Sequence, residues 1–142
     1  MKYNNIDNNS NNDKNNNNED LEDYIKNLDI YLANLEKLGV FFLLLGYSNY
    51  IFAANLDILE ALEENNTGIK PEDVFVYGQR FVLLGYILLY IVSMKRINER
   101  EFRNTYNDEN YDLNPYFEVA ISYFISVIAN LIRFNAFIRI DR

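Results

Sequence analysis

The stretch FVLLGYILLYIVSM, Phe81–Met94, decides how the rest of the chain is interpreted. In these fourteen residues the only strongly polar side-chain group is the hydroxyl of Ser93, and cations flank the stretch as Arg80 and Lys95. A helix at the surface of a water-soluble protein normally keeps one polar face in water. Apart from two tyrosine hydroxyls, four turns of this helix offer water almost nothing. The pattern therefore favours a helix whose surroundings are lipid or protein.

Two further segments resemble this one in length and polarity. The chain contains three apolar segments, at 38–56, 74–94 and 116–138, separated by polar connections. About twenty mostly apolar residues span the hydrocarbon core of a bilayer. Pro71 and Pro115 stand where a helix begins, because proline suits the first helical position. The sequence thus predicts an all-α fold: an integral membrane three-helix bundle with helices near 21–63, 71–104 and 115–139.

The alternative is a soluble all-α bundle, in which each helix would need a face that contacts water. The segment 74–94 has no such face, and 38–56 carries no charge among its nineteen residues. Two charges and two asparagines make 116–138 the most marginal of the three spans. Span length and the missing polar face favour the membrane bundle over the soluble one.

The chain before the first span divides into two parts. Residues 1–20 contain ten asparagines and almost nothing apolar, which predicts a disordered tail because too little surface can be buried to offset the entropy of ordering. From residue 21 onward, apolar residues recur at alternating spacings of three and four up to Leu38, which predicts an amphipathic helix. No proline or turn separates this helix from the first span. The predicted organisation is a 1–20 tail and a 21–142 helical membrane domain.

Composition excludes several classes of function. The chain has no cysteine and no histidine, and its net charge is −8. Without these residues there is no thiolate or imidazole to bind a metal or act as a nucleophile or base. The negative charge argues against nucleic acid as a partner, and the scattered glycines form no phosphate-binding loop. We therefore predict that the protein is not an enzyme and uses no metal or cofactor.

The charged residues inside the predicted spans are the first candidate site, since an ionisable group within a bilayer suggests function by default. Side A denotes the side from which the chain enters the membrane, and side B the opposite side. Counting depth along each helix places Asp57, Arg80 and Arg133 in the half nearer side B, where Asp57 could bridge both arginines. Glu118 falls near side A, close in depth to Lys37, Lys95 and Arg96. These pairs could hold the bundle together or line a functional site.

Two patterns of uncharged residues complete the candidates. Several amides and hydroxyls could line a pathway and form a candidate polar stripe: Asn49, Asn55, Ser122, Ser126 and Asn130. Small residues recur at a spacing of seven, which lets another helix approach closely: Gly39, Gly46 and Ala53 in the first span, Gly78 and Gly85 in the second.

These patterns support two hypotheses for function. The first is a non-enzymatic membrane protein, interacting or structural, whose partners are the lipid bilayer and either itself or another membrane protein. The alternative is a small transporter or channel component that uses the polar stripe. Positive charge near span ends marks the cytoplasm, and the loop after Met94 carries Lys95, Arg96, Arg100 and Arg103. The sequence therefore predicts a multi-pass protein of the cell membrane with a cytoplasmic N-terminus.

Overall fold

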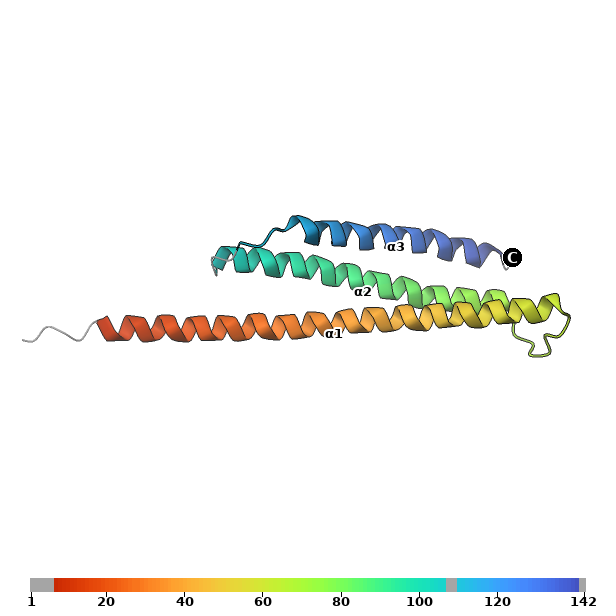
Figure 1. Cartoon of the computed structure of the whole chain (residues 1–142), viewed down its shortest axis with the longest axis horizontal. Helices are drawn as coiled ribbons and strands as arrows, with labels where there is room; N and C mark the ends of the chain where they lie inside the picture. Colours follow the sequence, from red (N-terminus) through yellow and green to blue (C-terminus); the bar gives the residue numbers. More distant parts are fainter. Residues whose placement is uncertain (1–6, 107–109, 141–142) are drawn as a thin grey trace, which may run out of the picture.

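The computed structural model describes residues 7–106 and 110–140, which form three α-helices (Figure 1). They are α1 (Asp7–Ala61), α2 (Pro71–Tyr106) and α3 (Asn114–Ile140). No strand occurs in these described ranges. The predicted all-α class and the order of three long helices are confirmed.

The central helix of the bundle is α2. Both α1 and α3 pack against it, and the chain reverses direction at each connection, so neighbouring helices are antiparallel (Figure 1). Near the start of α2 the rings of Tyr50, Phe75 and Phe137 contact one another, with centroids 5.6–6.3 Å apart, and so join all three helices.

The first helix runs without interruption through Lys37, as predicted. It begins at Asp7, and its N-terminal turns extend alone beyond the ends of α2 and α3 (Figure 1). A helix without neighbours gains no stability from tertiary packing. Residues 1–6 of the predicted disordered tail lie outside the described residues, whereas 7–20 are helical, so α1 begins before the predicted start at residue 21.

Local side-chain chemistry ends α1 and starts α2. After Ala61 the chain turns through Gly68, whose φ of 71° suits a residue without a Cβ. The Asn65 carboxamide holds this turn, because its Oδ1 accepts from the Thr67 hydroxyl (2.6 Å) and its Nδ2 donates to the Ile69 carbonyl (3.1 Å). Pro71 is the first residue of α2, in agreement with the sequence prediction.

The core between α1 and α2 follows a seven-residue repeat. The α1 positions on the seam are Ile25, Leu32, Gly39, Gly46 and Ala53, and those of α2 are Pro71, Gly78, Gly85, Val92 and Glu99, all of them buried. A repeat of seven keeps one seam facing the partner helix when the two helices supercoil gently around each other.

The glycines of this seam meet in pairs. A Cβ built on Gly85 would lie 2.8 Å from the Gly39 carbonyl oxygen, and one built on Gly78 would lie 2.9 Å from the Gly46 carbonyl oxygen. The small residues therefore act in helix packing, but within the chain: they bring α1 against α2. The α1 side of this face is thus covered by α2 of the same chain.

By length and composition, α2 and α3 could each cross a bilayer. A buried core helix of a soluble protein meets the same criterion. In α3, however, only 6% of the most apolar window is buried, against 28% in α2. α1 is not one of these two helices, and its span at 38–56 remains a prediction.

Candidate functional site

A buried polar junction joins the three helices inside the apolar region. We name it the Gln79 junction and define it by Tyr50, Gln79, Asn130 and Arg133. Gln79 of α2 is 0% exposed. Its Nε2 donates to both the backbone carbonyl and the side-chain Oδ1 of Asn130, each at 3.0 Å, and its Oε1 accepts from the Tyr50 hydroxyl. One side chain thus links α1, α2 and α3.

The Asn130 and Arg133 side chains complete the junction from α3. The Asn130 Nδ2 donates to the Ser126 carbonyl at 2.8 Å, and its Oδ1 also accepts from Arg133 Nη1 at 3.5 Å. Each polar group of Gln79 and Asn130 therefore has a partner, which buried polar groups require.

Sequence reasoning did not select Gln79 as a site residue. Its signal was nevertheless present, because Gln79 is the only side-chain amide between Val74 and Met94. Burying an amide without a partner costs several kcal/mol in an apolar medium. A lone glutamine in such a segment therefore implies a partner on a neighbouring helix.

We expect replacement of Gln79 with leucine to lower the free energy of unfolding by about 1–2 kcal/mol, since interhelical hydrogen bonds in membranes have this order of strength. Unfolding in mixed detergent micelles would measure the change. A double-mutant cycle with Asn130→Leu isolates the pair, and Asn55→Leu, at an exposed α1 position, is the matched control. Additive effects of the Gln79 and Asn130 variants would contradict the bridging role.

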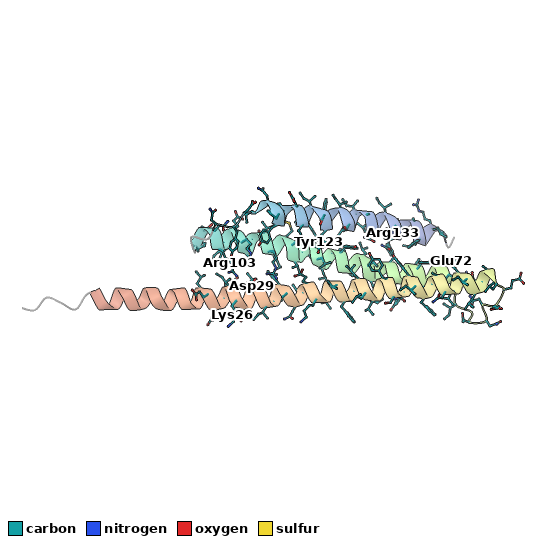
Figure 2. The ribbon with its side chains drawn as sticks, in the orientation of Figure 1. Lys26, Asp29, Glu72, Arg103, Tyr123 and Arg133 are labelled. Atoms are coloured by element: carbon teal, nitrogen blue, oxygen red, sulfur yellow. The ribbon has the colours of Figure 1, made fainter. Side chains whose placement is uncertain are left out.

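A second polar site, which we name the ion cluster, lies between α1 and α2 beyond Met94. It consists of three carboxylates and three guanidiniums: Asp29, Glu36, Glu99, Arg96, Arg100 and Arg103. Asp29 of α1 bridges two arginines of α2, with 2.6 Å contacts to Arg96 Nη1 and to Arg103 Nη2. Figure 2 shows Asp29 and Arg103 facing each other across the two helices.

The buried member of the ion cluster is Glu99, which is 3% exposed. Its Oε1 accepts from Arg103 Nε. Its Oε2 lies 3.7 Å from Arg100 Nε and 3.9 Å from Arg96 Nη1, distances that give electrostatic attraction without a hydrogen bond. Three of the four cations predicted to mark the cytoplasmic side, Arg96, Arg100 and Arg103, therefore lie beside carboxylates in the folded protein.

The predicted intramembrane ion pairs do not form in the described part of the chain. Asp57 and Arg80 are exposed and make no ion pair within 4.0 Å there, and Arg133 bonds to Asn130 instead. Glu118 is likewise exposed and makes no ion pair within 4.0 Å among these residues. Depth along a helix fixes the height of a side chain but not its direction around the axis: Arg80 follows the buried Gln79 by one residue, a rotation of roughly 100°.

The residues of the predicted polar stripe do not act together either. Asn49, Ser122 and Ser126 bond to carbonyls of their own helices, at Leu45 (2.8 Å), Val119 (2.7 Å) and Ser122 (2.9 Å) respectively. Such bonds satisfy a polar side chain in apolar surroundings without any partner helix. Asn55 is exposed. Of the stripe, Asn130 is the residue that bonds to a neighbouring helix.

A cavity of about 190 Å³ lies next to the ion cluster, between side chains of all three helices. Its lining residues are Glu36, Leu89, Val92, Ser93, Arg96, Tyr116, Val119 and Tyr123. Tyr123 reaches from α3 toward α2 in Figure 2. The Ser93 hydroxyl donates to the Tyr90 carbonyl at 2.7 Å. The cavity therefore combines aliphatic walls with a carboxylate and a guanidinium.

Neither polar site has the form of a metal centre. Over residues 7–106 and 110–140, no three carboxylate side chains come together in an arrangement that could hold a metal ion. Comparison with known proteins adds no function, since no protein family, curated protein or solved structure matches the chain.

Proposed function

We propose that the protein is a non-enzymatic integral membrane protein whose segments 38–56, 74–94 and 116–138 span the bilayer. The observation that supports this proposal is the exposure of large apolar side chains on all three helices over the same length of the bundle. They include Val40, Phe41, Leu44 and Ile51 on α1, Leu84 and Ile91 on α2, and Ile121, Ile125, Ile128 and Ile132 on α3. A soluble monomer rarely exposes such an extended apolar surface.

The distribution of charge supports the same proposal. Beyond Met94, α2 continues to Tyr106 alongside the amphipathic part of α1, and the ion cluster joins the two helices there. Lys95 lies over the ring of Tyr31, 5.9 Å from its centroid. The exterior of the bundle thus changes from apolar to charged at Lys95, as that of a helix pair leaving a membrane does. We call the paired part of α1 and α2 beyond this point, which contains the ion cluster, the stalk.

The polar groups within the bundle support a structural role rather than a transport role. In the Gln79 junction the amides of Gln79 and Asn130 are fully bonded, and the stripe serines bond to backbone carbonyls of α3. We therefore infer that these groups hold the helices together and that the protein acts through its surface and its stalk, as a structural or interaction component of the membrane. Transport through the stripe has no specific observation in its favour.

Extraction of membranes with alkaline carbonate tests the proposal. This treatment strips peripheral proteins but leaves spanning helices in lipid, so we expect the chain to remain in the membrane pellet. Replacing the exposed Ile121, Ile125 and Ile132 of α3 with lysine should impair insertion of α3 alone, because a central lysine costs roughly 3 kcal/mol, and the other two segments should still keep the chain in the pellet. Release of the unmodified protein into the supernatant would refute the proposal.

We expect the N-terminus and the α2–α3 connection to face the cytoplasm, because translocating Lys95, Arg96, Arg100 and Arg103 is unfavourable. The chain has no cysteine, so single cysteines can report the orientation. In intact cells an impermeant maleimide should label a cysteine at Asn66, in the α1–α2 turn, and not one at the exposed Asn98. The reverse labelling pattern would invert the topology.

A further inference from the structure

The cavity beside the ion cluster lies where the apolar exterior gives way to charge. Leu89 and Val92 line it on the apolar side of Met94, and Arg96 lines it on the charged side. Val119 of α3 adds another apolar wall, while Tyr116 and Tyr123 contribute amphipathic rings. A molecule that fills this cavity is therefore amphipathic, with its polar part directed toward Arg96.

The two charged groups of the cavity retain free hydrogen-bonding capacity. Arg96 Nη2 lies 3.9 Å from Glu36 Oε2, which is too long for a hydrogen bond. Arg96 uses Nη1 to bind Asp29, and a guanidinium has five N–H donors in total. The Glu36 side chain is 50% exposed. The Arg96 guanidinium and the Glu36 carboxylate thus lie side by side, and each can bind a further partner.

The size of the cavity indicates how much of a ligand it holds. At about 190 Å³ it is smaller than the 300–1,000 Å³ typical of sites that enclose a whole small molecule. It is therefore suited to one end of a molecule whose remainder lies elsewhere. A membrane lipid meets this condition, because its acyl chains stay in the bilayer beside the exposed apolar faces of α2 and α3.

We propose that this cavity binds the headgroup of a phosphatidylethanolamine-type lipid, with the phosphate accepting from Arg96 and the primary ammonium donating to Glu36. Both interactions are charge-assisted hydrogen bonds, which are the strong ones. The two-carbon linker of ethanolamine keeps phosphate and ammonium adjacent, as Arg96 and Glu36 are. Phosphatidylcholine has no N–H to donate, and phosphatidylglycerol has no cation. The inference rests on the proposed function, since it requires the bundle to lie in a bilayer.

Lipid binding by the purified full-length protein tests the proposal. Phosphatidylethanolamine, phosphatidylcholine and phosphatidylglycerol with identical acyl chains would be titrated into detergent micelles, with binding followed by native mass spectrometry. We expect phosphatidylethanolamine to bind roughly tenfold more tightly than either of the others, the factor that one charge-assisted hydrogen bond provides. Equal affinities, or a preference for phosphatidylglycerol that would indicate a site for anionic lipid, would overturn the proposal.

Two variants locate the site. Glu36→Gln should abolish the preference for phosphatidylethanolamine, whereas Glu118→Gln, which removes an exposed carboxylate of α3 lining no part of the cavity, should preserve it. Val119→Trp should block all three lipids by filling the cavity. A preference that survives Glu36→Gln would refute the assignment. Carbonate extraction separates the two proposals: a chain retained in membranes without this lipid preference refutes the lipid site alone, and a released chain refutes the proposed function.

Discussion

Replacing Gly46 with valine should force α1 away from α2 and lower the free energy of unfolding by about 3 kcal/mol or more. A Cβ at this position would lie 2.8 Å from the carbonyl oxygen of Gly78 and 2.9 Å from the amide nitrogen of Val82, and it would also collide with the Val82 side chain. Two of these three obstacles are backbone atoms, which cannot rotate aside. Relief therefore requires the helices to separate along their seam.

Ala54→Val is the matched control for this substitution. Ala54 lies on the same helix but is exposed, so valine there adds bulk outside the seam and should change stability by less than about 0.5 kcal/mol. Unfolding in mixed detergent micelles compares the two variants under the same conditions. Similar losses of stability for both would show that valine destabilises α1 locally and that close packing at Gly46 is not the cause.

Neutralising Glu99 should have the second large effect, a loss of about 3 kcal/mol. Its side chain is 1% exposed and lies within 4.0 Å of Arg96, Arg100 and Arg103. Glu99→Gln keeps the shape of the side chain but leaves these partly buried cations without their enclosed carboxylate. Asp29 compensates only in part, because it is more exposed and already binds two of them.

Glu101→Gln is the control for the ion cluster, since Glu101 lies on the same helix with an exposed side chain. The same unfolding assay, repeated at high salt, adds a second criterion. Buried charges are screened less than exposed ones, so the loss caused by Glu99→Gln should persist at high salt. An effect that disappears with salt, or one that Glu101→Gln reproduces, would contradict a buried ion cluster.

The seam between α1 and α2 could be recognised in part before the structure was known. The spacing of seven between Gly39, Gly46 and Ala53, and between Gly78 and Gly85, indicated a helix-packing face. The spacing did not indicate which helix would cover it. That choice depends on the antiparallel alignment of α1 and α2, which brings Gly39 to Gly85 and Gly46 to Gly78.

The polar sites were predicted less well, for a geometric reason. Asp57, Arg80 and Arg133 were grouped because they share a depth, yet a side chain only one residue from a buried position points roughly 100° away from it. Gln79 is buried and Arg80 is exposed for this reason. Asp29 and Arg103 are 74 residues apart, and no local pattern connects residues at that separation.

The sequence by itself determined the number and type of the helices and the approximate limits of α2 and α3, but not the start of α1, which lies at Asp7 and not near residue 21. Hydrophobic runs of 19–23 residues, prolines at the starts of α2 and α3, and the Asn65–Gly68 turn are local features, and local features carry their own structural preferences. Tertiary structure alone decided which polar groups meet. The rotation of each helix about its axis places Gln79 against Asn130 and Asp29 against Arg96. For α1 and α2 that rotation brings the glycines of the seam into close contact, and no local pattern in the sequence specifies it.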